Sequence, residues 1–376
     1  MQDKTVIHYT RDYLDQTTTW IYGQIKFNLD YQPVIFADRV VNLDQFPSPN
    51  LYGLTKDLSK WQYKKNKFVH RFTGLYPHFL KAAGNHSPRL IHAHFGNIGY
   101  KALPLSKRLN IPLITTFYGY EASALAKKEK YQKRFKTLFE EGTLVLAEGN
   151  HLRNELIRLG CSPEKSKVFH LGVEVENYPF RKRIIEESQP VKILFAASFV
   201  EKKGAKYALL AFAEAKKKYP NIRLKLIGNG PEREEVINLS KTLQLTNDIE
   251  WQGYIKYTDF VQEIYKADIF IQPSITASDG NTEGGSPVSL IDAQATGIPV
   301  LSTFHADIPE VVIHNKTGLL APEKDYQTLA DNLLKLLENP QLLADYGTAG
   351  RFHVEENYNI RKQGKILGEI YDSTWK

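Results

Sequence analysis

The amino-acid sequence predicts an α/β protein with two Rossmann-like, doubly wound domains that face each other across a cleft. At 376 residues the chain is too long for one typical hydrophobic core, so two domains are expected. Short, almost continuous apolar runs alternate with helical segments, which is typical of parallel strands that are covered on both faces. Residues 178–190 are charged and interrupt this alternation. We interpret them as the linker between domains at residues 1–180 and 181–376.

The N-terminal half starts with a short predicted strand, Val6–Tyr9, then a polar loop at residues 15–19 and a helix from Trp20. Further apolar runs predict strands at residues 33–37, 90–94, 113–117, 144–147 and 168–171. Helical segments separate these runs, as βαβ units require. This half is therefore predicted to form one doubly wound domain.

The alternation resumes in the C-terminal half. Apolar runs predict strands at residues 193–197, 224–228, 268–273 and 300–303, and helices are predicted over residues 206–218 and around Val236, Leu239 and Leu243. The last helix, about residues 358–376, is a candidate to pack back on the N-terminal domain. Ligands of such sheets bind outside the carboxyl ends of the strands, so both domains are expected to line the cleft.

The composition, 42% hydrophobic and 24% charged, is that of an ordinary globular protein. The single cysteine, Cys161, excludes an intramolecular disulfide and fits a reducing, cytoplasmic setting. Residues 1–5 show no apolar signal-peptide core, and no apolar run approaches the length of a membrane span. We therefore expect a protein that neither spans a membrane nor is exported.

The net charge of +7 is unevenly distributed, because residues 1–180 hold 25 Lys+Arg against 16 Asp+Glu and the remainder holds 24 against 26. Basic clusters with interleaved aromatic residues lie at residues 60–67 and 127–136. Such clusters suit anionic lipid headgroups, a lipid-linked acceptor or nucleic acid, and they are also common on solvated helix faces. Of these partners we retain a peripheral contact with an anionic membrane and not nucleic acid.

The stretch from Thr282 to Asp292 predicts a glycine loop that leads directly into a helix. Ser286 suits the N-cap and Pro287 the first helical position. A helix start offers free N–H groups and the positive end of the helix dipole to a phosphate. Glu283 precedes the helix, and Asp292 lies six residues past Ser286, roughly 9 Å along the axis. A carboxylate on each side of a phosphate would suit a nucleotide sugar, although an ordinary capped helix would show the same pattern.

Several motifs occur in one order along the C-terminal half, at residues 198–204, 226–231, 267–274, 283–292, 305–310 and 318–322. In this order and spacing they resemble the retaining glycosyltransferases of family four, which have the GT-B fold. The N-terminal half resembles the family more loosely, at residues 91–96 and 116–121. Residues 17–21 are similar to the N-terminal loop of members that build colanic acid and other surface polysaccharides. The resemblance implies transfer of a sugar from a nucleotide-sugar donor, bound by the C-terminal domain, to an acceptor bound by the N-terminal domain.

The resemblance also implies roles for individual residues. Lys203 would bind the diphosphate and neutralise the leaving nucleotide. The alternative is a surface lysine in a charged turn, which is also our interpretation of Lys202. Glu283 would hold hydroxyls of the donor sugar or stabilise an oxocarbenium-like transition state. Asp292 would accept hydrogen bonds from the ribose. The backbone N–H groups of Gly284, Gly285 and Ser286 would meet the phosphates. Asn229 and Gly230 would approach the base, and a tight turn explains them equally well.

The chain departs from the family pattern at four positions. The family pairs two glutamates at Glu-x7-Glu, whereas here eight residues separate Glu283 from a shorter Asp292. Ser198 replaces an arginine that is a second cation for the diphosphate. Tyr118 replaces a histidine that contacts the donor sugar; it can donate a hydrogen bond but is a poor base near neutral pH. His94 is a further catalytic candidate or a packed histidine.

Tyr120 and Glu121 are candidates for the acceptor side. No metal cofactor is expected, because the sequence has neither an Asp-x-Asp triplet nor a His/Cys cluster with zinc spacing. The expected donor is a UDP- or GDP-sugar, the expected acceptor a saccharide or lipid-linked molecule, and the setting the cytoplasm or the inner face of the plasma membrane. Two other functions stay open: a sugar-nucleotide epimerase, and a sugar-nucleotide-binding protein that has lost catalysis. The joint presence of Lys203, Glu283 and Asp292 favours the transferase.

Overall fold

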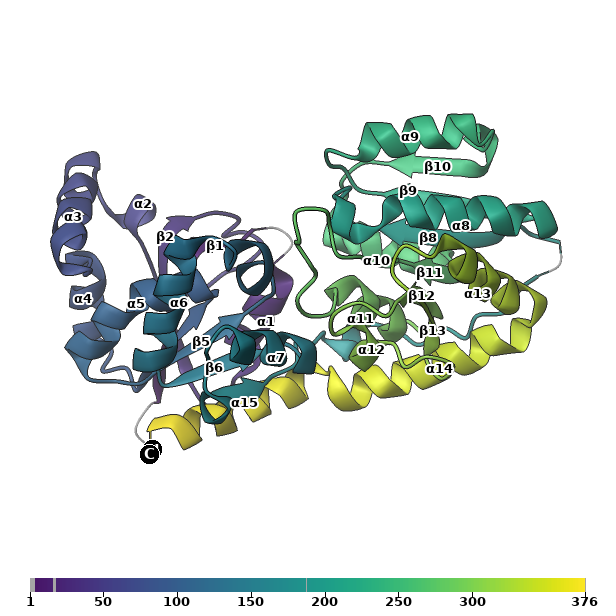
Figure 1. Ribbon diagram of the computed structural model, residues 1–376. Coiled ribbons are helices and arrows are strands. Elements are labelled where there is room, and N and C mark those ends of the chain that lie inside the picture. The colour runs from purple at the N-terminus through teal and green to yellow at the C-terminus, as the bar shows by residue number, and fades with distance from the viewer. Residues whose placement is uncertain (1–3, 16–17, 187, 376) are drawn as a thin grey trace. The chain divides into compact units, whose positions relative to one another are not determined.

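The computed structural model describes residues 4–15, 18–186 and 188–375 (Figure 1). The chain divides into two compact units, Met1–Gly172 with Ile360–Lys376 and Val173–Asn359. The boundary therefore falls a few residues before the predicted one, and the chain returns to the first unit for its last helix.

The first unit is built on a parallel sheet with the strand order β3-β2-β1-β4-β5-β6-β7. Its strands are β1 (Thr5–Tyr13), β2 (Gln32–Val40), β3 (Leu51–Gly53), β4 (Leu90–His94), β5 (Leu113–Phe117), β6 (Leu144–Ala147) and β7 (Ser166–Val168). The order reverses between β1 and β4, which is the place where doubly wound sheets bind ligands. Five of the predicted strands are present, and the three-residue β3 went unpredicted. The strand predicted at residues 168–171 is wrong in position, because Phe169 and Leu171 are buried beside the edge strand rather than in it.

The helices of this unit are α1 (Thr19–Phe27), α2 (Leu54–Asp57), α3 (Lys60–Thr73), α4 (Pro77–Gly84), α5 (Gly96–Leu109), α6 (Glu129–Glu141), α7 (Asn150–Arg158) and α15 (Ile360–Trp375), with a π-helical turn at Glu121–Leu125. Alternate strand residues face opposite sides: Ile7 and Ile91 pack with α4 to α7, whereas Val6 and Leu90 pack with α15. Both faces of the sheet are therefore buried, as the continuous apolar runs predict.

The helix α15 is joined to the first unit by specific polar contacts. The Lys4 ammonium donates to the Asp372 carboxylate at 2.7 Å, and the Tyr31 hydroxyl donates to the same carboxylate at 2.7 Å. The Tyr371 hydroxyl lies 2.6 Å from Nδ1 of His92 in the middle of the sheet. The C-terminal helix thus packs back on the N-terminal domain, as its sequence position allowed.

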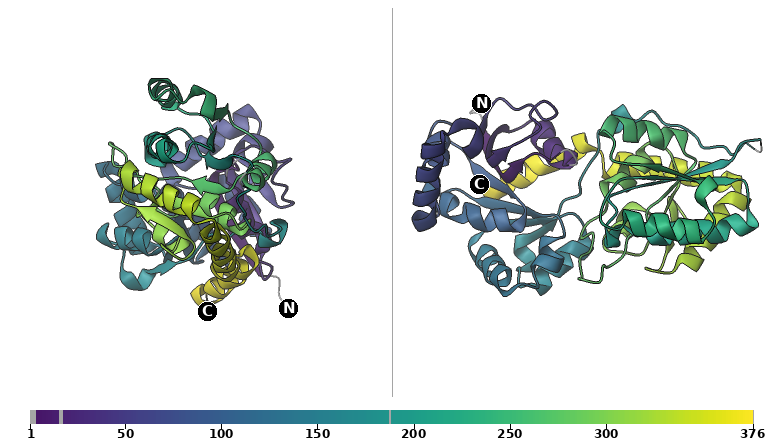
Figure 2. Two further views of the ribbon diagram at one scale, coloured as in Figure 1. Left: turned by 90° about the vertical axis from the view of Figure 1, so that its right-hand side faces the viewer. Right: turned by 90° about the horizontal axis from the view of Figure 1, so that it is seen from above.

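The second unit is built on a parallel sheet in the order β10-β9-β8-β11-β12-β13. Its strands are β8 (Val191–Ala196), β9 (Ile222–Ile227), β10 (Ile249–Gln252), β11 (Ile269–Ile271), β12 (Val300–Thr303) and β13 (Gly318–Ala321), and its helices are α8 (Ala205–Lys218), α9 (Arg233–Thr242), α10 (Tyr257–Lys266), α11 (Val288–Ala295), α12 (Ile308–Val311), α13 (Tyr326–Glu338) and α14 (Pro340–Asn357). Helices α8, α9 and α13 cover one face and α10, α11 and α12 the other (Figure 2). The strand predicted at residues 268–273 ends early, at Ile271.

The interpretation of residues 178–190 as a linker is wrong for their first half. Arg183 is only 1% exposed, and its guanidinium donates to the carbonyl oxygens of Ile264, Ala267 and Thr296. These carbonyls stand at the C-terminal ends of α10 and α11, where a cation meets the negative end of each helix dipole. Burial lowers the pKa of Arg183 to about 10, which leaves it charged. Of this basic run, Arg183 is buried and binds the ends of two helices, whereas Arg181 and Lys182 are exposed.

None of the helices in the described part of the chain is both long enough and apolar enough to cross a lipid bilayer.

Candidate active site

In the second unit, two lysines meet a buried glutamate at the carboxyl ends of β8 and β11. The turn after β8 ends at Gly204, whose φ of 70° is in the left-handed region. A Cβ at Gly204 would lie 1.9 Å from the carbonyl oxygen of Pro273, so only glycine fits. This close approach brings Lys202 and Lys203 to the segment that follows β11.

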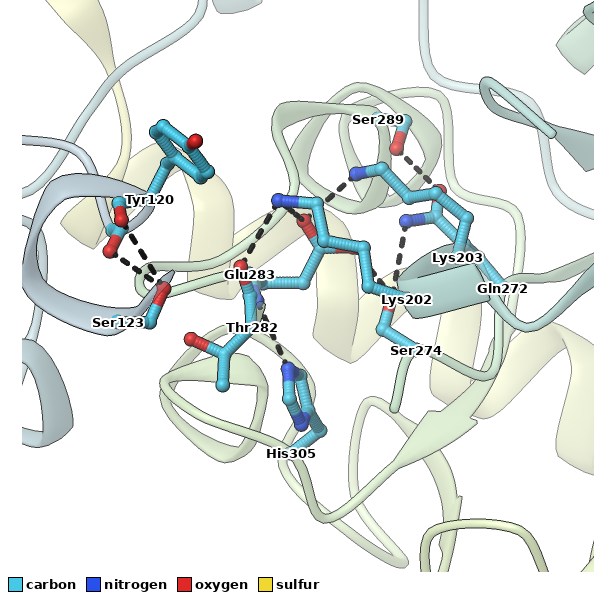
Figure 3. Close-up of polar contacts among 11 residues, drawn as sticks. Tyr120, Ser123, Lys202, Lys203, Gln272, Ser274, Thr282, Glu283, Ser289 and His305 are labelled. Carbon is cyan, nitrogen blue, oxygen red and sulfur yellow. Dashed lines mark hydrogen bonds and ion pairs between the residues drawn. The ribbon is translucent and has the colours of Figure 1, made fainter. Parts of the chain in front are cut away.

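The ammonium of Lys203 lies 2.8 Å from Oε2 of Glu283, and the Ser274 hydroxyl donates to Oε1 of the same carboxylate at 2.9 Å (Figure 3). Gln272 supports Ser274, since its Nε2 lies 3.4 Å from the Ser274 hydroxyl while its Oε1 accepts from Ser289 at 2.7 Å. The carboxylate of Glu283 is thus held at both oxygens.

Burial alone would raise the pKa of Glu283, whose residue is 8% exposed. The charges of Lys203 and Lys202 and the hydrogen bonds to Lys203 and Ser274 act the other way, and the pKa lies below its usual value. Glu283 is therefore an anion at neutral pH.

Lys202 is not the simple surface lysine that the sequence suggested. Its ammonium donates to the Thr282 carbonyl at 3.0 Å and lies 3.6 Å from Oε2 of Glu283. Its side chain is 18% exposed, almost the same as the 19% of Lys203. Two cations therefore converge on the loop that leads to α11.

His305 holds the backbone of Glu283. Its Nε2 accepts the Glu283 N–H at 3.0 Å, so the proton of the neutral ring is on Nδ1, which donates to Oε1 of Glu323 at 2.7 Å. Glu323 in turn accepts the Thr276 N–H at 2.7 Å through Oε2. The sequence motif at residues 305–310 contained this support, but no role could be given to it from the sequence.

The start of α11 differs from the prediction. The helix begins at Val288 with Pro287 as the N-cap residue, and the Ser286 hydroxyl donates to the Asp307 carbonyl at 2.6 Å instead of capping the helix. The reason is competition, because a serine hydroxyl bonds whichever group the fold brings to it. Gly284 adopts a φ of 79°. Within the described residues, no protein group accepts from the N–H groups of Gly284, Gly285 or Ser286.

Asp292 lies on α11, and its carboxylate binds the side chains of two tyrosines rather than Lys203. The hydroxyls of Tyr178 and Tyr257 both donate to Oδ1, at 2.7 and 2.8 Å. Burial raises the pKa of Asp292 to about 6, against the effect of the two hydroxyls. Within the described residues Oδ2 accepts no hydrogen bond.

Ser198, Asn229 and Gly230 form a turn at the ends of β8 and β9. The Tyr254 hydroxyl donates to the Asn229 carbonyl at 3.1 Å and lies 3.3 Å from the Ser198 hydroxyl. Gly230 has a φ of 156°, and a Cβ there would lie 2.4 Å from the carbonyl oxygen of Phe199. The tight-turn interpretation therefore accounts for Gly230; the approach of this turn to a base stays a prediction.

In the first unit, His94 and Tyr118 belong to a buried hydrogen-bonded chain. The Tyr118 hydroxyl lies 2.7 Å from Nδ1 of His94 and accepts from Gln24 at 3.3 Å, and Nε2 of His94 lies 3.0 Å from Nδ1 of His8. Burial lowers the pKa of His94 and raises that of Tyr118, so both are neutral. The hydrogen bond between Tyr118 and His94 can run in either direction. If Nδ1 of His94 carries no proton, the Tyr118 hydroxyl donates to it; if Nδ1 carries the proton, the hydroxyl accepts and can donate to another group.

The nitrogens of His8, His92 and His94 lie within 4.8 Å of one another, a cluster that the sequence did not reveal. His8 and His92 are register partners on β1 and β4, and His94 follows on the same face. The hydroxyls of Tyr371 and Thr116 already engage both nitrogens of His92, at 2.6 and 2.7 Å. Hydrogen bonding thus explains the cluster without a metal ion, and Nε2 of His8 is the nitrogen left without a partner among the described residues.

The two acceptor-side candidates differ in exposure. Tyr120 is 48% exposed, whereas Glu121 is buried and its Oε1 accepts the N–H groups of Gly96 at 3.3 Å and Tyr118 at 3.1 Å. Glu121 therefore fixes the ends of β4 and β5 to each other. Contact of either residue with an acceptor stays a prediction.

Comparison with known proteins fits this arrangement. The family model described as glycosyl transferases group 1 matches residues 178–353, and the model described as glycosyltransferase family 4 matches residues 29–177. The amylovoran biosynthesis glycosyltransferase AmsK of Erwinia amylovora is 33% identical over 281 residues, 74% of this chain and 69% of AmsK. The chain belongs to the glycosyltransferases of group 1.

WcaL of Salmonella typhimurium is as similar to the transferase as AmsK is, with 33% identity over 74% of this chain and 69% of WcaL. Its name assigns WcaL provisionally to colanic acid biosynthesis. Among solved structures, Anabaena Alr3699/HepE in complex with UDP and glucose has a TM-score of 0.78 at 16% identity and covers 98% of this chain and all of its own. The transferase thus has the GT-B fold, with its two Rossmann-like units.

Of the candidate site residues of the transferase, the structure brings together Lys203 and Glu283 in the second unit and His94 and Tyr118 in the first. It gives Asp292 separate tyrosine partners. The residues missed from the sequence are Ser274, His305 and Tyr257. Ser274 and His305 stand in the motifs at residues 267–274 and 305–310, but their contacts with Glu283 depend on the fold, as does the contact of Tyr257 with Asp292.

Proposed function

We propose that the chain is a retaining, metal-independent hexosyltransferase that moves a sugar from a UDP- or GDP-sugar to a saccharide or lipid-linked acceptor during synthesis of a cell-surface polysaccharide. The observation that carries this proposal is the pair of lysines on the ionised Glu283, beside the free N–H groups of the loop before α11. A diphosphate at this loop would find two cations and a helix start.

Lys202 can supply the second positive charge for the diphosphate that Ser198 does not carry. The family's second diphosphate cation is absent at position 198, yet the partly buried Lys202 stands next to Lys203 and only 3.6 Å from the same carboxylate. In the free protein Glu283 neutralises the two lysines. With the donor bound, the diphosphate shares them, and Glu283 is released towards the hydroxyls of the sugar.

Oδ2 of Asp292 suits the ribose. The two tyrosine hydroxyls fix the carboxylate through Oδ1 and leave Oδ2 for the ribose hydroxyls. In this arrangement Tyr178 and Tyr257 are positioning residues, and the shorter aspartate is compensated by the rigidity that they impose.

In the proposed reaction the bond between the anomeric carbon and the acceptor oxygen forms while the bond to the diphosphate breaks. The electron pair leaves with the nucleoside diphosphate, whose charge Lys202 and Lys203 stabilise. The acceptor proton goes to the departing phosphate oxygen. Burial lowers the pKa of His94, which makes its ring a weak base, and raises the pKa of Tyr118, which keeps its hydroxyl protonated. The buried thiol of Cys161 supports a reducing, cytoplasmic setting.

A thermal-shift screen against UDP-, GDP-, ADP- and dTDP-sugars tests the donor site. One class of donor should raise the melting temperature of the native protein by several degrees, since a ligand at 100 times its Kd stabilises by about 2.7 kcal/mol. Lys203→Ala should lose the shift, whereas the exposed Lys206→Ala should keep it. No shift with any donor, for a folded protein, would refute the assignment.

The native protein with its donor is then supplied with acceptor fractions, and the anomeric configuration of the product is read by NMR with and without EDTA. An inverted product, or activity abolished by EDTA and restored by a metal, would contradict the corresponding part of the proposal. Donor binding without transfer would favour the second candidate, a sugar-nucleotide-binding protein, which the engaged hydroxyl of Tyr118 keeps open.

A further inference from the structure

Helix α3 (Lys60–Thr73) lies on the outside of the first unit, next to α4 (Figure 1). A capping box opens it, in which the Ser59 hydroxyl and the Gln62 side chain bond each other's backbone N–H, and Gly74 in the left-handed region closes it. Asn66 is its one fully buried residue among those described. The helix is thus well defined at both ends while most of its circumference faces solvent.

Three large aromatic side chains on α3 are exposed: Trp61 at 70%, Phe68 at 66% and Phe72 at 72%. Their spacing of seven and four residues places them on one helix face. The rings of Phe68 and Phe72 lie 5.0 Å apart, which makes the stripe continuous at its end. A single exposed aromatic residue is ordinary, but a stripe of three indicates an interaction surface.

The cations around this stripe have no carboxylate partner among the described residues. Lys60, Lys64, Lys65, Lys67 and Arg71 are exposed, and none of them forms an ion pair with a carboxylate in the described part of the chain. The sequence has no Asp or Glu from residue 58 to residue 120, a stretch that holds ten Lys and Arg. The ammonium of Lys65 lies 5.6 Å from the ring centre of Trp61, so charge and aromatic surface are interleaved.

The combination of exposed aromatic rings and exposed cations indicates which kind of partner binds α3. A second copy of the chain that docked through the same helix would bring like charges together, because α3 carries no Asp or Glu. Nucleic acid would satisfy the charges, but a stripe of aromatic side chains on one convex helix offers no groove in which bases stack. An anionic lipid surface takes both features, because aromatic rings settle at the headgroup level while lysines reach the phosphates.

We propose that α3 is a membrane-docking helix, which lies in the surface of an anionic bilayer with Trp61, Phe68 and Phe72 inserted and its lysines and arginine on the headgroups. The binding is peripheral. The inference goes beyond the transferase activity and does not depend on it, since it concerns the first unit alone.

The experiment is sedimentation of the full chain with vesicles of phosphatidylcholine alone or mixed with phosphatidylglycerol. The native protein should bind the mixed vesicles and release them at high salt. Lys64→Glu/Lys65→Glu and Phe68→Ser/Phe72→Ser should each weaken binding by about tenfold or more. The matched controls lie in the second unit: Lys218→Glu/Lys316→Glu, two exposed lysines whose replacement makes the same change of charge, and Phe352→Ser, an equally exposed phenylalanine. Both controls should bind as the native protein does.

Tryptophan fluorescence gives a second readout, in which mixed vesicles should shift the emission of the native protein to the blue and leave Trp61→Phe unshifted. All substituted side chains are exposed, so unchanged melting temperatures should show that the variants fold. Equal binding to both kinds of vesicle, or equal loss in the lysine control of the second unit, would overturn the proposal. So would binding of DNA in place of vesicles, or a dimer in sedimentation equilibrium that the Phe68→Ser/Phe72→Ser variant abolishes.

Discussion

The Lys203 ammonium and the Glu283 carboxylate form an ion pair at 2.8 Å, although 80 residues separate them in the chain. The carboxylate side chain is 6% exposed, so the pair is shielded from solvent more than a surface salt bridge is. This pair sets the charge balance of the site before any donor arrives.

Lys203→Ala should destabilise the second unit, because it leaves the buried carboxylate with the Ser274 hydroxyl and, as its remaining cation, Lys202 at 3.6 Å. The expected loss is about 3 kcal/mol in the free energy of unfolding, measured by urea denaturation. The double variant Lys203→Ala/Glu283→Gln should recover part of this loss, since no unpaired charge remains. Lys206→Ala serves as the control. If the double variant loses more free energy of unfolding than the two single variants together, the unpaired charge is not the cause of the loss.

Asp292 should give the protein a pH-dependent stability with a defined sign. Its folded pKa of about 6 lies above the usual 3.8, so the native state holds the proton more tightly. Between roughly pH 4 and 6 the free energy of unfolding should therefore fall as pH rises, by about 3 kcal/mol for this group. Asp292→Asn removes the group, and its stability relative to the native protein should rise across this window. A constant difference would contradict the raised pKa.

His305→Ala should weaken donor binding indirectly, through the position of Glu283. The change leaves the N–H of Glu283 without an acceptor and costs about 1–3 kcal/mol in stability. His305→Gln should restore much of both effects, because its amide oxygen can accept the same N–H. Isothermal titration with the donor from the thermal-shift screen measures this. Equal loss in both variants would mean that the ring itself, rather than the hydrogen bond, is needed.

Tyr118→Phe should destabilise the first unit by about 1–3 kcal/mol, because His94 and Gln24 both lose a buried partner. Tyr120→Phe, two residues away and exposed, should have almost no effect on stability. Thermal unfolding followed by circular dichroism separates the two. An unchanged melting temperature for Tyr118→Phe would mean that this hydrogen-bonded chain carries no stability.

The fold was predictable because most of its strands are apolar runs buried on both faces and alternate with helices. Leu144–Ala147 and Ile269–Ile271 show this plainly. Short edge strands such as Leu51–Gly53 were missed, since three residues carry no period. Arg183 was misinterpreted for a different reason: its partners are carbonyls more than 80 residues away, and a charged run looks the same whether it is solvated or buried.

The proximity of Lys203 and Glu283 was predictable because both stand in motifs, at residues 198–204 and 283–292, that resemble those of the family. The site was not predictable where a common residue acts through the fold. The hydroxyl of Ser286 was expected to cap α11 but bonds Asp307 across the unit. The cluster of His8, His92 and His94 depends on the register of β1 and β4, which the sequence does not specify.

The position of α15 has a consequence for biogenesis. The first unit needs Tyr371 against His92 and Asp372 against Lys4, yet both residues are synthesised after the whole of Val173–Asn359. On the ribosome, the second unit can complete its core while the first still lacks a helix. The structure therefore predicts that the usual order, in which the N-terminal domain finishes first, is reversed for this chain. Any fragment cut near residue 172 would leave His92 and Lys4 exposed to water or to the wrong partner.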